Sequence, residues 1–112
     1  MKNNVLLIGG SGTLGSSIIK SELFKELLYP NSKELNILNQ KHLEKYFLKH
    51  NIKLIIHCAA LARVRDCERN KEKALKINVK GTSNIVSAIL RLNRNYNKKI
   101  KLIFISSDAV YK

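Results

Sequence analysis

The stretch of sequence that decides the fold is Val5-Leu6-Leu7-Ile8-Gly9-Gly10-Ser11-Gly12-Thr13-Leu14-Gly15. Its four apolar residues end at two glycines, a pattern typical of a strand buried on both faces of a parallel sheet. The glycines then follow the spacing G-x-x-G-x-x-G and lead into a helical pattern. Small residues at such a turn let backbone N–H groups at the helix start approach a pyrophosphate, which the helix dipole also favours. We therefore expect a dinucleotide site here; the alternative is a plain strand-to-helix turn whose glycines serve only the backbone.

A P-loop shares part of this spacing and is a second alternative. Gly10 and Gly15 are separated by four residues, as in G-x-x-x-x-G-K-(S/T), but Ser16-Ser17 follows where that motif needs Lys and then Ser or Thr. Without the lysine that reaches the phosphates, the sequence argues against a nucleoside triphosphatase.

Strand-like and helix-like segments alternate along the rest of the chain. Apolar residues at helical spacing run from Leu14 to Leu28, although Leu27-Leu28-Tyr29 before Pro30 is either the helix end or a very short second strand. The remaining expected elements are a short helix over 43–48 capped by Asn39, a strand over 53–58, a long helix over 72–93 in which Gly81 permits close packing, and a strand over 100–105. This order predicts an α/β, Rossmann-like doubly wound parallel sheet of three to four strands. The loops that begin at Gly9, Ala59 and Ser106 should then share one edge of the sheet.

The composition limits the class of protein. The 112 residues, 45% of them hydrophobic, fit a single domain over 1–112. No apolar run approaches the roughly 18 residues needed to cross a bilayer, and no secretory signal is evident. Cys58 and Cys67 lack C-x-x-C spacing, and the three histidines show no metal-ligand spacing. We expect a cytoplasmic protein without a disulfide, a metal site or a membrane partner.

The net charge of +13 favours anionic partners, among which nucleic acids and phosphorylated ligands are the main classes. A basic cluster surrounds the segment before the last strand and comprises Arg91, Arg94, Lys98, Lys99 and Lys101. Only Tyr96 is interleaved with it, so no platform for stacking bases is evident. Nucleic-acid binding, whose mark would be a steep salt dependence, stays a third hypothesis that we do not favour.

Five ordered motifs resemble those of one family, the extended short-chain dehydrogenase/reductases that act on nucleotide sugars. They are Val5–Gly15, the E-L-N-I-L-N segment of 34–39, His57-Cys58-Ala59-Ala60, the N-V-K-G-T-S-N segment of 78–84, and the F-I-S-S-D-A-V-Y segment of 104–111. Within that family the motifs are most similar to those of dTDP-4-dehydrorhamnose reductases, with GDP-fucose synthases close behind. The resemblance implies that the chain is the NAD(P)-binding, amino-terminal part of a reductase that acts on a 4-keto nucleotide sugar.

The resemblance also implies a role for individual residues in binding the cofactor. The residues that would hold the pyrophosphate are Gly9, Ser11, Gly12, Thr13, Leu14 and Gly15. Asn36 and Ile37 would lie against the adenine, at a position where the family more often has Asp. The other expected cofactor contacts are Ala59, Ala60 and Leu61, which would line the riboses, and Asn78. For the alanines the alternative role is packing at the strand end.

Ser107 matches the family's catalytic Ser/Thr position, where the hydroxyl would hydrogen-bond the substrate oxygen during hydride transfer. The alternative is an ordinary hydroxyl at a strand end. For the cofactor, Lys33 after the second-strand region slightly favours NADP over NAD, whereas Glu34 would favour NAD. A solvated surface lysine is the other interpretation of Lys33.

One part of the family's chemistry is missing from these 112 residues. No Tyr stands four residues before a Lys on a helix, because Pro30 interrupts the spacing between Tyr29 and Lys33. We therefore expect only the first part of the sheet, with the apolar strand 102–105 exposed at its edge and prone to self-association. The second hypothesis is a truncated, non-catalytic dinucleotide-binding or interaction module, so whether this chain is an enzyme stays open.

Overall fold

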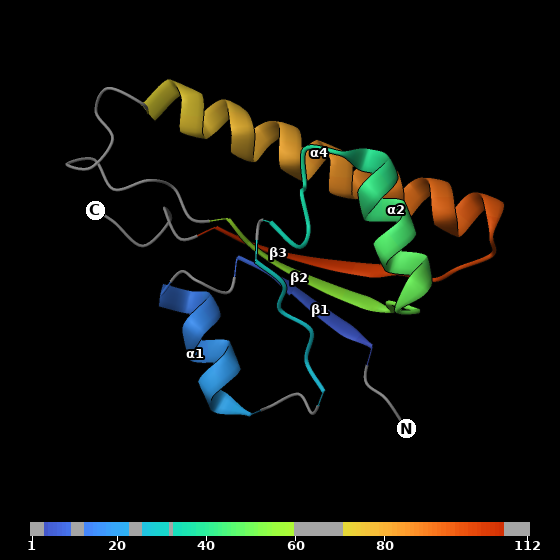
Figure 1. The fold of residues 1–112 in the computed structure, drawn as a ribbon, viewed down its shortest axis with the longest axis horizontal. Helices are drawn as coiled ribbons and strands as arrows, with labels where there is room; N and C mark the ends of the chain where they lie inside the picture. Colours follow the sequence, from blue (N-terminus) through green and yellow to red (C-terminus); the bar gives the residue numbers. More distant parts are fainter. Residues whose placement is uncertain (1–3, 10–12, 23–25, 32, 60–70, 107–112) are drawn as a thin grey trace.

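The computed structural model describes residues 4–9, 13–22, 26–31, 33–59 and 71–106. Three strands form a parallel sheet in the order β1-β2-β3, with β1 at Val5–Ile8, β2 at Leu54–Ala59 and β3 at Lys101–Ser106 (Figure 1). The register aligns Ile8 with His57, and Ala59 with Ser106. The carboxyl ends of all three strands therefore lie at one edge, as the alternating pattern predicted.

A fourth segment pairs with the free edge of β1 through Leu28. The Leu28 N–H donates to the Val5 carbonyl oxygen at 3.0 Å, and the Leu7 N–H donates to the Leu28 carbonyl oxygen at 2.8 Å. The segment around Leu28 is thus a very short strand, which decides between the two alternatives left open by the sequence.

The first helix is shorter than its apolar spacing suggested. Helix α1 spans Thr13–Ser21, so of the two alternatives for residues 27–29 the helix end is excluded. Glu22 and Glu26 have φ angles of 57° and 59°, and a left-handed residue directly after a helix ends it. Because Leu28 lies outside the helix, its backbone can form hydrogen bonds with the outer edge of β1.

The sheet is covered on both faces, with α2 (Gln40–Lys49) and α4 (Lys71–Asn95) on one face and α1 on the other (Figure 1). Alternate strand residues enter different cores. The core under α2 and α4 contains Leu6, Ile8 and Ile55 from the strands, with Leu43, Phe47, Ile85, Ala88 and Leu92 from the helices. The core under α1 contains Val5, Leu7, Ile56 and Cys58, with Ile18 and Ile19 packed against them. The doubly wound arrangement predicted from the sequence is confirmed.

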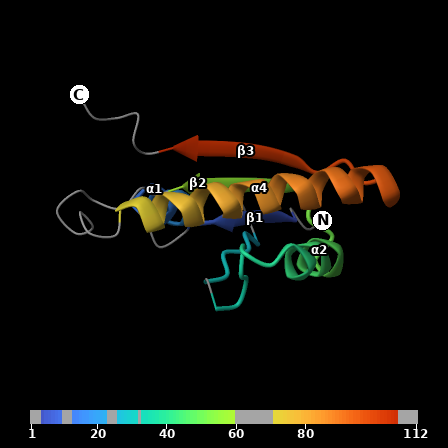
Figure 2. The ribbon, with the colours of Figure 1, turned by 90° about the horizontal axis from the view of Figure 1, so that it is seen from above.

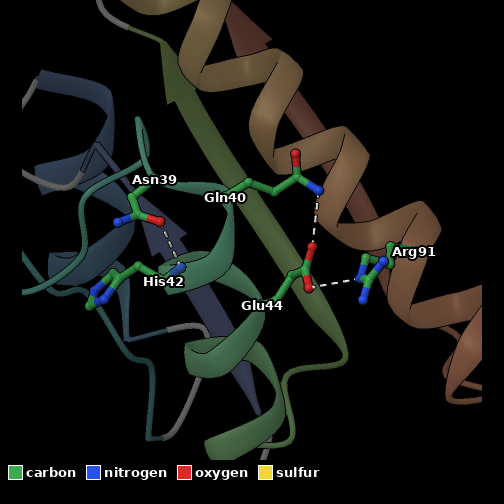
Figure 3. A network of polar contacts seen from close by, with 5 residues as sticks. All are labelled: Asn39, Gln40, His42, Glu44 and Arg91. Atoms are coloured by element: carbon green, nitrogen blue, oxygen red, sulfur yellow. Dashed lines mark hydrogen bonds and ion pairs between the residues drawn. The ribbon is translucent and has the colours of Figure 1, made fainter.

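Polar contacts join α2 to its own amino end and to α4 (Figure 3). The Asn39 side chain caps α2 by accepting a hydrogen bond from the His42 N–H at 3.1 Å, as expected for this residue. Glu44 accepts from Gln40 Nε2 at 2.9 Å and from Arg91 Nε at 3.0 Å, so one carboxylate links the two helices. Among the described helices, none is both long and apolar enough to span a bilayer.

Strand β3 is the least covered part of the sheet. Figure 2 shows it at one side of the layer, with no described element beyond it. The side chains of Ile103 and Phe104 are 47% and 49% exposed, although the run of 102–105 in β3 is entirely apolar. The apolar, open edge expected from the sequence is present.

Candidate dinucleotide-binding site

The turn after β1 is built around Gly9. This glycine has a φ angle of +92°, a conformation that side chains other than hydrogen rarely tolerate. A Cβ atom at this position would collide with the Cys58 carbonyl oxygen and lie 3.1 Å from the Cys58 carbonyl carbon. Only glycine lets the chain leave β1 in this direction while passing so close to the end of β2.

Helix α1 starts at Thr13, beyond that turn, and runs back along the sheet (Figure 1). Its amino terminus therefore lies toward the carboxyl edge of the strands, where the helix dipole favours an anion. Thr13 and Leu14 occupy the first turn of this helix, and Gly15 is buried in it. The other two residues predicted to hold the pyrophosphate, Ser11 and Gly12, lie outside the described residues.

The ends of β2 and β3 form the next part of the same edge. Ala59 is the last residue of β2 and pairs with Ser106, the last residue of β3. Ala60, Leu61 and the predicted catalytic Ser107 lie outside the described residues. The structure thus places the end of β2 next to the Gly9 turn, and the end of β3 on the far side of β2 at the same edge.

A compact turn follows the short strand at Leu28. The Asn31 side-chain oxygen accepts hydrogen bonds from the N–H groups of Lys33 at 2.9 Å and Glu34 at 2.8 Å. The Glu34 carboxylate in return accepts from the Asn31 N–H at 3.0 Å, which is the reciprocal arrangement of a capping box. The Glu34 carboxylate is therefore engaged within its own turn, while Lys33 is exposed.

The predicted adenine-binding residues form a second turn that rests on α4. Asn36 is exposed, and its side-chain oxygen accepts from the Leu38 N–H at 3.0 Å. The Ile37 carbonyl oxygen accepts from Asn84 Nδ2 at 3.0 Å. The Ile37 side chain lies against Gly81, where an added Cβ atom would collide with Ile37 Cδ1 and lie 2.8 Å from Cγ1. The close packing expected at Gly81 is confirmed, and Ile37 is its partner.

Asn84 is the residue whose part in this site the sequence interpretation missed. It is the last residue of the N-V-K-G-T-S-N segment of 78–84. Its signal was the spacing of three from Gly81, which places both residues on one face of a helix. Asn78, predicted to contact the cofactor, lies on the same helix six residues earlier.

Two titratable groups near the ends of the strands belong to the packing of the sheet. His57 is 3% exposed, its Nδ1 has no hydrogen-bond partner in the part of the chain that the structure describes, and its ring meets Phe104 edge-on at a centroid distance of 5.4 Å. Burial lowers the pKa of His57 and raises the pKa of the neighbouring Cys58 thiol. At neutral pH the buried His57 imidazole is therefore neutral, and the buried Cys58 thiol is protonated.

Comparison with known proteins places the chain in a family. All of residues 1–112 match the model of the RmlD substrate binding domain. UDP-glucose 4-epimerase of Mycoplasma genitalium is 33% identical over 131 residues, which cover 98% of this chain and 37% of that enzyme. GDP-L-colitose synthase of Yersinia pseudotuberculosis is 30% identical, with 96% of this chain and 34% of that enzyme covered. The chain spans about a third of the length of the curated relatives it matches.

Solved structures agree with this placement. The dTDP-4-dehydrorhamnose reductase of Bacillus anthracis in complex with NADP is 28% identical, with a TM-score of 0.74 over 99% of this chain and 38% of that chain. The dTDP-4-dehydrorhamnose reductase of Clostridium acetobutylicum is 29% identical, with a TM-score of 0.66 over 91% of this chain and 34% of that chain. Reductases and epimerases are thus both similar to this chain. With its Rossmann-like sheet, its glycine turn and its match over residues 1–112, the chain belongs to the RmlD substrate binding domain family, within the extended short-chain dehydrogenase/reductases of the nucleotide-sugar type.

Proposed function

We propose that this chain binds NADP(H) at the carboxyl edge of its sheet and is the cofactor-binding part of a reductase that acts on a 4-keto nucleotide sugar. The observation that carries the proposal is the Gly9 turn. It passes so close to the Cys58 carbonyl that any side chain at residue 9 would collide with β2, and α1 begins four residues later with its amino end toward the carboxyl edge of the sheet. The similarity to the NADP complex of the Bacillus anthracis reductase supports the same ligand.

Each segment at the carboxyl edge of the sheet would bind one part of the cofactor. N–H groups of the Gly9–Gly15 segment would bind the pyrophosphate, with Ser11, Gly12, Thr13 and Leu14 forming the turn. Asn36 and Ile37 would flank the adenine, Ala59, Ala60 and Leu61 would leave room for the riboses, and Asn78 would add a further contact with the cofactor. Lys33, exposed after the Leu28 strand, would attract the 2′-phosphate of NADP.

The chemistry of the bound cofactor is hydride transfer. Ser107 follows the end of β3 and would donate a hydrogen bond to the substrate carbonyl oxygen that gains negative charge as the hydride arrives. The proton donor of the family is the Tyr of a Tyr-x-x-x-Lys pair on a helix, and the one such spacing in these 112 residues, Tyr29 to Lys33, is interrupted by Pro30. We therefore expect the 112-residue chain to bind the cofactor and to show no turnover by itself.

The test is a titration of the chain with NADPH and, in parallel, NADH, followed by nicotinamide fluorescence or calorimetry. Gly12→Asp would add a carboxylate where the pyrophosphate is expected, and should weaken binding at least tenfold. The matched control is Asn95→Asp, which adds the same charge on an exposed residue at the carboxyl end of α4, away from the candidate site. A folded wild-type chain that binds neither dinucleotide would overturn the proposal.

A second candidate function is epimerisation, which the 33% identity to UDP-glucose 4-epimerase favours. A reductase must exchange its oxidised cofactor after every cycle, whereas an epimerase returns the hydride to the same sugar and has no need to release it. Release of bound NADPH within seconds of dilution would support the reductase, and retention through gel filtration would support the epimerase.

A further inference from the structure

Helix α4 holds the turn at residues 36–38 by two adjacent contacts. The Asn84 side chain donates to the Ile37 carbonyl oxygen at 3.0 Å, and this bond joins residues 47 apart in the sequence. One turn earlier on the same face, Gly81 leaves the space that the Ile37 side chain fills. The backbone and the side chain of Ile37 are therefore both fixed by α4.

The other hydrogen bonds of this turn are local. The Asn36 side chain binds the Leu38 N–H, and the Asn39 N–H binds the Asn36 carbonyl at 3.1 Å. Such bonds shape the turn but do not set its distance from the sheet. Asn84 and Gly81 fix the distance between the turn and the sheet, because they connect the turn to α4. This helix packs on β2 and β1 through Ile85 and Leu92.

We propose that Asn84 is a positioning residue for the adenine end of the cofactor site. It holds the Ile37 carbonyl toward α4, so that the exposed Asn36 side chain and the peptide of 36–37 present a constant surface to the base. Without its N–H donor, the partly buried carbonyl loses its partner, and an unpaired carbonyl there favours rotation of the turn toward water. This inference deepens the proposed function and rests on it.

Asn93 provides an internal control for the same kind of contact. It lies on α4 nine residues after Asn84, and its side chain also binds backbone, donating to the Ile100 carbonyl oxygen at 3.2 Å and accepting from the Ile100 N–H at 2.9 Å. This contact anchors the start of β3, at the opposite end of the sheet from the glycine turn. Loss of Asn93 should therefore cost stability without changing cofactor binding.

The experiment compares Asn84→Ala with Asn93→Ala in the full 112-residue chain. Alanine has a higher helix propensity than asparagine, so α4 is retained in both variants. Three probes are titrated: NADPH, adenosine 2′,5′-bisphosphate for the adenine half, and reduced nicotinamide mononucleotide for the other half. We expect Asn84→Ala to weaken NADPH and the adenosine probe about tenfold, which corresponds to about 1.4 kcal/mol, and to leave the mononucleotide within twofold of wild type. Asn93→Ala should leave all three within twofold.

A second variant makes the test independent of the hydrogen bond. Gly81→Ala keeps Asn84 but pushes the Ile37 side chain away from α4, and should reproduce the selective loss of the adenosine probe. Circular dichroism identifies folded variants, and if Asn84→Ala does not fold, Gly81→Ala decides alone. Equal loss of both half-probes, or no loss beyond that of Asn93→Ala, overturns the inference. Failure of wild type to bind NADPH instead overturns the proposed function.

Discussion

Strands β1 and β3 have similar apolar sequences and different surroundings. All four residues of β1 are buried, because β2 and the Leu28 segment pair with its two edges and helices cover its two faces. Strand β3 has one described neighbour, and Ile103 and Phe104 are about half exposed. The candidate site lies at the end of the fully enclosed strand, where a glycine turn can be held rigidly. The two strands therefore differ in burial more than in residue type: β1, which positions the site, is enclosed, and β3 remains exposed.

The largest difference should appear in stability. Leu7→Ala removes a completely buried side chain from the core between the sheet and α1, and should lower the free energy of unfolding by about 3 kcal/mol. Ile103→Ala, on the half-exposed strand, should cost less than about 1 kcal/mol. Urea denaturation of both variants measures this contrast, and equal losses would show that β3 is as well packed as β1.

The open edge should also control association between chains. We expect wild type to self-associate through β3, as apolar unpaired strands tend to do. Ile103→Lys should weaken this association about tenfold in sedimentation experiments, since a charged edge residue opposes strand pairing. Leu90→Lys places the same charge on an exposed apolar residue of α4 and should have little effect. A wild-type chain that stays monomeric at high concentration contradicts this prediction.

The buried His57 makes the sheet sensitive to acid. Burial lowers its pKa in the folded chain, so below about pH 6.5 the unfolded chain binds a proton that the folded chain does not. Stability should consequently fall as the pH drops below 6.5, by at most about 1.4 kcal/mol per pH unit for one proton, until the lowered folded pKa is reached.

Replacement of the imidazole tests this source of pH dependence. In urea denaturation, the free energy of unfolding of His57→Leu should change less between pH 6.5 and 5 than that of wild type. His50→Gln, at the end of α2 and outside the sheet, is the control for removal of an imidazole elsewhere in the chain. An unchanged slope in His57→Leu would assign the acid sensitivity to other groups.

The smallest expected effect concerns the choice between the two dinucleotides. Lys33 is exposed, so water weakens its attraction to a phosphate. Lys33→Glu should reduce the preference for NADPH over NADH about fivefold, whereas Lys41→Glu, exposed on α2, should leave the ratio unchanged. Competition titrations with the two cofactors measure the ratio, and equal shifts in both variants would point to the overall charge of the chain.

Much of this fold could be predicted because its signals are local. The apolar run of Val5–Ile8, the Asn39 cap and the long pattern of α4 each depend on neighbours within a few residues, and the structure confirms all three. The end of α1 could not be predicted from apolar spacing. It depends on left-handed residues at Glu22 and Glu26 and on the hydrogen bonds that Leu28 makes with β1, a strand more than twenty residues away.

The same distinction holds for the candidate site. The sequence by itself determined that glycines follow a buried strand, that a second buried strand ends at alanines, and that the motifs are those of one family. Only the tertiary structure decided that the Gly9 turn closes on the Cys58 carbonyl, that Glu34 is engaged by Asn31, and that Asn84 holds Ile37. Spacing along a chain reports which residues share one face of an element. Contacts between elements depend on how those faces pack, which no local pattern contains.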